Sequence, residues 1–150
     1  MQVYFAGTIM GDRSHVATFR RIVEHIQSRG HFVPTSHVAR ENVLDEEVSH
    51  TPQEVYDRDV TWLRASDCLV AEVSTPSLGV GYELAYALQC GKPVLCLHRR
   101  GKPISKMVSG CTEPGIIVRD YGDVAEALAL VDEFLTRRSA ISTQHSAAEG

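Results

Sequence analysis

Residues 67–91 read DCLVAEVSTPSLGVGYELAYALQCG, a stretch that combines a strand, a loop and the start of a helix. The short apolar run that ends at Val73 is typical of a parallel strand buried on both faces. Turn-forming residues follow at 74–77, and apolar residues then return at helical spacing from Tyr82 to Leu88. Open α/β sheets bind ligands in loops at the carboxyl ends of their strands. The stretch therefore predicts an α/β fold with a ligand site in this loop.

The alternation of strands and helices continues on both sides of this stretch. Further strands are expected at 2–6, 31–38, 94–98 and 115–119, and helices from Ser14 to Gly30, from Thr51 onward, and at 104–111 and 123–135. Residues 40–50 are expected to be a solvated acidic loop, and Pro34 should place the second strand near a sheet edge or bend. Five strands interleaved with about five helices predict a doubly wound α/β domain of Rossmann or flavodoxin type, with helices on both faces of a mostly parallel sheet.

The composition is that of a soluble globular protein. The chain has 150 residues, of which 43% are apolar and 23% charged, and its formal net charge is −4. We expect one catalytic domain at 1–137 and a disordered tail at 138–150, where apolar periodicity ends. No basic surface for nucleic acid is expected. Because no apolar run reaches the ~18 residues of a membrane span and no signal peptide is evident, we expect a cytoplasmic protein, with the nucleus as the alternative.

The sequence shows no pattern typical of a metal or cofactor site. The four cysteines, at positions 68, 90, 96 and 111, contain no C-x-x-C and are expected to be reduced thiols, mostly buried. The seven histidines lack metal-ligand spacing. Leu84 stands where a dinucleotide fingerprint needs its third glycine, and the segment from Gly7 to Gly11 lacks the Walker lysine. We therefore expect neither a metal nor a cofactor.

The loop at 74–81 and the following helix suit chemistry on a phosphorylated sugar. Ser77 and the N–H groups of Gly79 and Val80 are placed at a helix N-terminus, which favours phosphate. Glu83, expected in the first helical turn, would be kept ionised by the same field. An ionised carboxylate beside a phosphate pocket suits nucleophilic attack on an anomeric carbon. Alternatively, Ser77 is only a helix cap and Glu83 only offsets the helix dipole.

Two further side chains could reach this site from other elements. Asp59 falls within or beside the apolar face of the helix that begins at Thr51, and a desolvated carboxyl there could donate a proton to a leaving group. The structural alternative for Asp59 is an ion pair with Arg58 or Arg64. Tyr4 lies on the first expected strand. Considered by itself, it is most simply interpreted as a core residue.

Three segments carry a resemblance to a known family. The segments YFAGTI at 4–9, YDRDVTWL at 56–63 and SDCLVAEVSTPSLGVGYEL at 66–84 resemble the nucleoside 2-deoxyribosyltransferase superfamily. Within it, they are most similar to the Rcl-type 2′-deoxynucleoside 5′-phosphate N-hydrolases. The resemblance spans roughly residues 3–135. It implies a hydrolase that cleaves the N-glycosidic bond of a 2′-deoxynucleoside 5′-monophosphate, releasing the free base and 2-deoxyribose 5-phosphate.

The resemblance also implies roles for particular residues. Glu83 would be the nucleophile that forms a covalent glycosyl intermediate, Tyr4 would orient it, and Asp59 would assist departure of the base. Phosphate and substrate would be bound by three groups of residues. They are Gly7, Thr8 and Ile9 in the first loop, Ser77 and Gly79 at the helix start, and Ser105 with Met107 near the subunit contact. Ser105 would enter the neighbouring subunit's site, which implies an obligate homodimer.

One departure from the resemblance lies in the first loop. The Rcl-type loop usually reads GSIRGG, whereas residues 7–12 here read GTIMGD, with Met10 in place of the arginine and Asp12 gained. The basic run Arg99, Arg100 and Lys102 is a candidate replacement for the lost charge. Three alternative functions stay open, namely a nucleoside 2-deoxyribosyltransferase, a CMP-type ribonucleotide N-glycosidase and a non-catalytic nucleotide-binding module.

Overall fold

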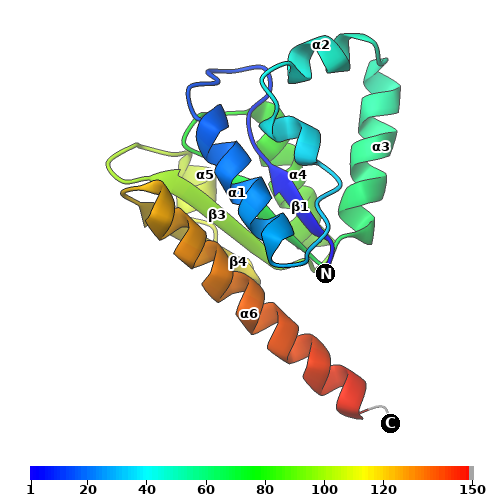
Figure 1. Cartoon of the computed structure of the whole chain (residues 1–150), viewed down its shortest axis with the longest axis vertical. Coiled ribbons are helices and arrows are strands. Elements are labelled where there is room, and N and C mark those ends of the chain that lie inside the picture. Colours follow the sequence, from blue (N-terminus) through cyan, green and yellow to red (C-terminus); the bar gives the residue numbers. More distant parts are fainter. Residues whose placement is uncertain (149–150) are drawn as a thin grey trace.

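The computed structural model describes residues 1–148, and their side chains as far as residue 140. Four parallel strands form its sheet, in the spatial order β1 (Val3–Ala6), β2 (Cys68–Glu72), β3 (Val94–Arg99) and β4 (Ile116–Tyr121) (Figure 1). The register pairs Tyr4 with Leu69 and Leu69 with Val94. The carboxyl ends of the strands therefore share one edge of the sheet.

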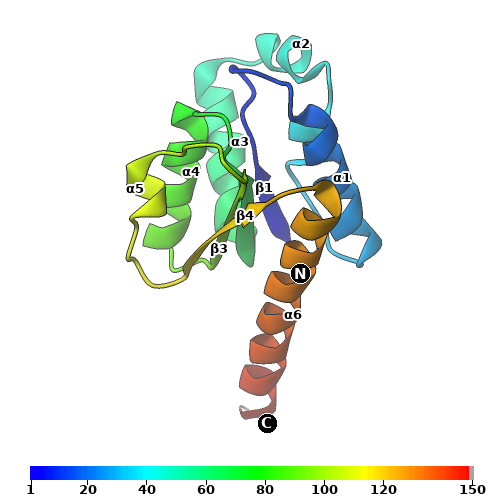
Figure 2. The same cartoon turned by 90° about the vertical axis from the view of Figure 1, so that its left-hand side faces the viewer.

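Helices cover both faces of this sheet. Along the chain they are α1 (Val16–Ser28), the 3₁₀ helix η1 (Ser36–Ala39), α2 (Val43–Val48), α3 (Pro52–Ala65), α4 (Leu78–Gln89), α5 (Lys106–Ser109) and α6 (Val124–Ala148). Helices α1 and α6 lie on one side, and α3, α4 and α5 on the other (Figure 2). The doubly wound α/β fold expected from the sequence is confirmed.

Side chains that alternate along β1 enter two separate cores. Val3 and Phe5 pack with Phe19 on the α1 and α6 side, whereas Tyr4 packs with Leu84 on the α4 side. Successive residues of a strand point to opposite faces of the sheet, which is why one strand serves both cores. The same alternation aims Tyr4 toward α3 and α4.

The prediction of a fifth strand at 31–38 was wrong for the described chain. Phe32 makes only an isolated parallel bridge with Gln2, in which the Val3 N–H donates to the Phe32 carbonyl at 2.8 Å. Pro34 follows and has no N–H to extend such pairing. The chain then turns into η1, so it crosses at the edge of the sheet beside β1 without adding a strand.

Two segments expected to lack regular structure are helical. Residues 43–48, inside the expected acidic loop, form α2, which buries Val43 completely. In the expected tail at 138–150, α6 continues through Ala148, and residues 149–150 lie outside the described residues. Extending a helix costs far less than nucleating one, and the alanines beyond residue 138 favour the helical state.

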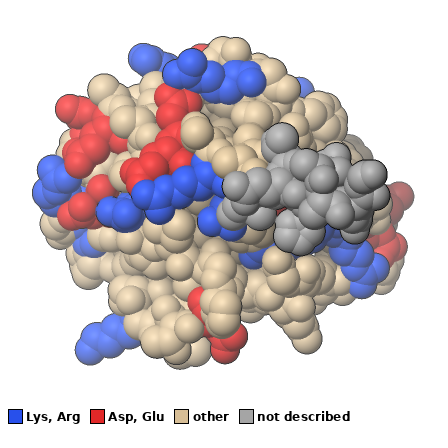
Figure 3. Space-filling model, turned by 90° about the horizontal axis from the view of Figure 1, so that it is seen from below, with Lys and Arg blue, Asp and Glu red and all other residues tan. Residues whose placement is uncertain are grey.

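The helix cap, the cysteines and the surface charges can also be placed in the structure. Thr51 and Glu54 form a reciprocal capping box at the start of α3, in which the Thr51 N–H donates to Glu54 Oε2 at 2.7 Å. Cys68 and Cys96 are buried free thiols, whereas Cys90 is exposed. None of the described helices combines the length and the apolar character needed to cross a bilayer. On the face in Figure 3, lysine and arginine side chains lie among acidic ones and form no continuous basic patch.

Candidate active site

The loops that follow β1 and β2 lie against each other at the carboxyl edge of the sheet. A Cβ added to Gly11 would lie 3.4 Å from Thr75 Cγ2 and 3.7 Å from the Pro76 carbonyl oxygen. This contact joins segments more than sixty residues apart in the chain. The two loops therefore face each other at this edge of the sheet.

Tyr4 and Glu83 form a direct hydrogen bond beneath these loops. The Tyr4 hydroxyl donates to Glu83 Oε1 at 2.5 Å, and the Tyr4 side chain is buried. Because α4 begins at Leu78, Glu83 lies in the second turn rather than the expected first turn. Burial raises the pKa of Glu83 from 4.5 to about 7; the Tyr4 hydrogen bond opposes the rise and the charge of Asp59 adds to it. The helix N-terminus therefore does not keep Glu83 fully ionised at neutral pH.

Asp59 shares a cavity with this pair. The cavity has a volume of about 150 Å³, and its lining includes Tyr4, Asp59 and Glu83. Tyr56, Tyr82 and Tyr86 supply aromatic walls from α3 and α4. The three residues predicted from the sequence to carry the chemistry are thus brought together by β1, α3 and α4.

Asp59 also makes the ion pair that the sequence allowed as an alternative. Arg58 Nε donates to Asp59 Oδ1 at 2.8 Å, whereas Arg64 instead donates to the Tyr86 hydroxyl at 2.6 Å. Asp59 therefore combines both sequence interpretations, because it is paired and lines the cavity.

The N-terminus of α4 lies beside the same cavity. Ser77 is the N-cap residue, and its Oγ accepts from the Val80 N–H at 3.3 Å. Accepting that bond leaves the Ser77 hydroxyl proton available to donate to a ligand. The first N–H groups of a helix have no partner within the helix, and Gly79, which lines the cavity, carries one of them. Gly79 therefore brings the helix N-terminus to the cavity that contains Glu83, whereas Ser77 lines the neighbouring groove.

The first loop is held by its own contacts. Thr8 is buried, and its Oγ1 accepts from the Gly11 N–H at 3.1 Å. Gly7 is required by packing, since an added Cβ would lie 2.8 Å from the Phe19 ring. Ile9 is partly buried and packs against the core on the α1 side. The Thr8 hydroxyl thus stabilises the loop and, as at Ser77, keeps its proton available to donate.

Arg13 stabilises the first loop, a role that sequence reasoning missed. Its guanidinium donates to the carbonyl oxygens of Thr8 at 2.8 Å, Val38 at 3.2 Å and Arg40. No local pattern in the sequence could reveal it, because two of the three acceptors lie about 25 residues away. Met10, in the position of the expected arginine, is 88% exposed.

The basic run after β3 is partly occupied by ion pairs. Arg100 donates to Asp120 at 3.3 Å and to Glu126 at 2.7 Å. Those two acids satisfy the guanidinium on the β4 and α6 side of the sheet. Arg100 is therefore committed within the protein rather than held ready for a phosphate.

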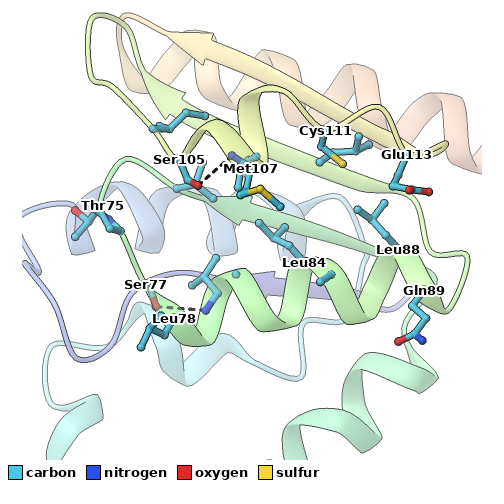
Figure 4. A pocket seen from close by; sticks show the side chains of 18 residues that line it. Thr75, Ser77, Leu78, Leu84, Leu88, Gln89, Ser105, Met107, Cys111 and Glu113 are labelled. Carbon is cyan, nitrogen blue, oxygen red and sulfur yellow. Dashed lines mark hydrogen bonds between the residues drawn. The ribbon is translucent and has the colours of Figure 1, made fainter.

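Ser105 and Met107 lie across a large groove from Ser77. The groove has a volume of about 900 Å³ and runs between α4 and α5. Figure 4 shows Ser105 and Met107 on the α5 side, facing the α4 side chains. Leu78 is 97% exposed and Met107 85% exposed, which is unusual for large apolar side chains. Ser105 caps α5 by accepting from the Met107 N–H at 3.2 Å.

These features define a class of protein. It is a parallel α/β protein that gathers a tyrosine, two carboxylates and a helix N-terminus at the carboxyl edge of its sheet. Among the described residues, no three His, Cys, Asp or Glu side chains are grouped to hold a metal ion. The family model described as nucleoside 2-deoxyribosyltransferase matches residues 3–128, and the chain belongs to this family.

Relatives in sequence and structure agree with this assignment. A protein of Thermofilum pendens, provisionally named 2′-deoxynucleoside 5′-phosphate N-hydrolase 1, is 45% identical over 137 residues, which cover 90% of this chain and 95% of that protein. The 5-hydroxymethyl-dUMP N-hydrolase of Tetraodon nigroviridis is 45% identical over 126 residues, covering 81% and 88%. The structure of Clostridium botulinum CMP N-glycosidase superposes with a TM-score of 0.66 at 16% identity over 88% of this chain and 99% of that one, a likeness of fold alone.

Proposed function

We propose that the protein hydrolyses the N-glycosidic bond of 2′-deoxynucleoside 5′-monophosphates, giving a free base and 2-deoxyribose 5-phosphate. The observation that carries the proposal is the Tyr4–Glu83 hydrogen bond at the floor of the cavity that Asp59 also lines. The names of the two sequence relatives support this reaction class. A protein that only binds nucleotides has no need for a buried tyrosine bonded to a glutamate.

Glu83 is the nucleophile in this mechanism. A carboxylate oxygen of Glu83 attacks C1′ and forms an ester bond, while the C1′–N bond breaks and its electron pair leaves with the base. Tyr4 holds the attacking carboxylate in place, and Asp59, on the wall of the same cavity, engages the base and assists its departure. Water then attacks C1′ and displaces the Glu83 carboxylate, so that its hydroxyl joins the sugar, its proton is taken up by the departed base, and configuration is retained overall.

Glu83→Ala is the direct test of the nucleophile. It should abolish base release from a deoxynucleoside monophosphate while circular dichroism shows an intact fold. Glu24→Ala, on the exposed face of α1, is the matched control and should retain activity. Wild-type turnover by the Glu83 variant would exclude a glycosyl-Glu83 intermediate.

Substrate assays separate hydrolysis from its alternatives. A panel of deoxy- and ribonucleoside 5′-monophosphates, analysed by chromatography for free base, should show base release that depends on the 5′-phosphate. Adding a second base should leave the rate of free-sugar formation unchanged, whereas a transferase would form a new nucleoside. A preference for CMP over every deoxynucleotide would instead favour a ribonucleotide N-glycosidase.

We further propose that a second copy of the chain covers the groove between α4 and α5 and places its Ser105 in the phosphate site. The exposed side chains of Leu78 and Met107 would be buried by such a partner. Ser77 and Ser105 line the same groove, so a neighbouring chain seated there would bring a second hydroxyl toward the α4 N-terminus. Met107 would contact the substrate from the same turn.

Mixing two inactive variants tests whether Ser105 acts in the neighbouring subunit. The homodimers of Glu83→Ala and of Ser105→Ala should each have little or no catalytic activity. In a mixed dimer, one site would combine the intact Glu83 of one chain with the intact Ser105 of the other, so mixing should restore activity. Activity no higher than that of Ser105→Ala alone would show that Ser105 does not act between subunits.

A further inference from the structure

An ion network connects Asp59 to α2, the helix that sequence analysis took for a loop. Arg58 donates to Asp59 Oδ1 through Nε and to Glu47 Oε1 through a terminal nitrogen, both at 2.8 Å. The side chains of Arg58 and Asp59 are each 22% exposed, and that of Glu47 is 17% exposed. Exposed ion pairs contribute little, but pairs withdrawn from solvent to this degree are screened less.

The guanidinium of Arg58 is fixed on its remaining sides as well. Its central carbon lies 5.0 Å from the centre of the Trp62 ring, and a terminal nitrogen lies 3.4 Å from His37 Nε2. Burial lowers the pKa of Arg58, but its hydrogen bonds to Asp59 and Glu47 outweigh that effect and leave the pKa raised. The planar guanidinium is hydrogen-bonded along its edges and packs against the Trp62 ring with one face. It therefore has little freedom to move away from Asp59.

The two carboxylates of the cavity compete for ionisation. The negative charge of Asp59 raises the pKa of Glu83, as like charges sharing one site do. A carboxylate must be ionised to act as a nucleophile. A positive group bonded to Asp59 therefore favours the reactive form of Glu83 without contacting it.

We propose that Arg58, held by Glu47, is a positioning residue that fixes the Asp59 carboxylate and offsets its charge, so that Glu83 can ionise beside it. This role rests on the proposed function for its effect on turnover. The other titratable groups that face the network come from β1, α4, α2 and η1, and they are Tyr4, Glu83, Glu46 and His37.

Three variants separate the charge of Arg58 from its geometry. Arg58→Gln removes the charge that offsets Asp59, so the titration of Glu83 should move upward from about 7. Arg58→Lys keeps the positive charge but cannot bond Asp59 and Glu47 through two separate nitrogens of a planar group. The kcat should therefore fall, while the titration of Glu83 stays near that of wild type. Glu47→Gln removes the group that holds Arg58 against Asp59, so kcat should fall and the Glu83 titration should move upward by less than in Arg58→Gln.

The titration of Glu83 is measured independently of activity, by carbon NMR of ¹³C-labelled glutamate side chains assigned with Glu83→Gln. The acidic limb of the kcat/KM profile should move with it. The control variant is Arg20→Gln, which removes the exposed ion pair with Glu41. It should behave as wild type in kcat and in the Glu83 titration.

The outcomes distinguish the inference from the proposed function. A Glu83 titration in Arg58→Gln equal to that of wild type would overturn the inference, whether or not the protein releases base. Absence of base release by wild type, together with the expected NMR shift, would refute only the proposed function. If Arg58→Gln does not fold, Glu47→Gln decides, because a Glu83 titration equal to that of wild type in that variant contradicts the proposal.

Discussion

Replacing Glu83 with glutamine should stabilise the fold at alkaline pH. The pKa of Glu83 is raised from 4.5 to about 7 in the folded protein, chiefly by burial. The folded state therefore binds a proton more tightly than the unfolded chain, and stability falls as pH rises from about 4.5 to about 7. Because each pKa unit is worth about 1.4 kcal/mol, ionising Glu83 costs the fold about 3 kcal/mol at pH 8.

Glutamine carries no such cost and can still accept the hydrogen bond from Tyr4. Glu83→Gln should therefore be more stable than wild type by as much as about 3 kcal/mol at pH 8, and close to wild type at pH 4.5. For a chain of this size, that gain corresponds to a rise in Tm of roughly 6–12 °C. The variant should meanwhile have lost base release, so stability and activity would change in opposite directions.

Differential scanning calorimetry of both proteins at pH 4.5, 6 and 8 measures the effect. Glu24→Gln on the exposed face of α1 is the control, and its Tm should follow that of wild type at every pH. If Glu83→Gln were no more stable than wild type at pH 8, or if its advantage were equal at pH 4.5 and 8, the argument from burial would be refuted.

Three further substitutions test other parts of the structure. Tyr4→Phe removes the hydrogen bond that lowers the pKa of Glu83, so the acidic limb of kcat/KM should move to higher pH; a limb at the wild-type position would contradict this role. In the wild type the Tyr121 hydroxyl donates to Glu72 Oε1 at 2.9 Å, so Glu72→Ala leaves that buried hydroxyl without an acceptor. Urea titration should show that the free energy of unfolding falls by at least ~1–3 kcal/mol. Thr51→Ala breaks the capping box of α3 and should cost ~1 kcal/mol in the same assay, with kcat unchanged; a variant as stable as wild type would show that the cap is dispensable.

The departure in the first loop can now be described in physical terms. The sequence shows that an arginine is missing at position 10, and this suggested a loss of positive charge at the phosphate. The structure places Arg13 within the same loop, but there it donates to the carbonyl oxygens of Thr8, Val38 and Arg40. Its contacts keep the loop against η1 and the segment that follows it. The loop is therefore supported by an arginine that comes later in the chain.

Local patterns were sufficient for most of the elements. The buried strand, loop and helix at 67–91, the capping box at Thr51 and the amphipathic α1 were all predictable, because periodicity and caps depend on residues within a few positions of each other. The same reasoning failed at 31–38, where strand-forming residues lack a partner beyond Phe32. Whether a β-rich segment becomes a strand depends on a neighbour that local sequence does not specify.

The sequence by itself therefore determined the α/β class, the loop at the start of α4 and the residue types able to act on a glycosidic bond. Only the tertiary structure decided how those residues meet. The Tyr4–Glu83 hydrogen bond joins residues 79 positions apart, and the raised pKa of Glu83 comes from burial between β1, α3 and α4. The pairing of Asp59 with Arg58 was one of the alternatives open from the sequence, but the pairing of Arg58 with Glu47 depends on an α2 helix that the acidic sequence did not reveal. Hydrogen bonds, burial and neighbouring charge act through space, so the folded chain sets them.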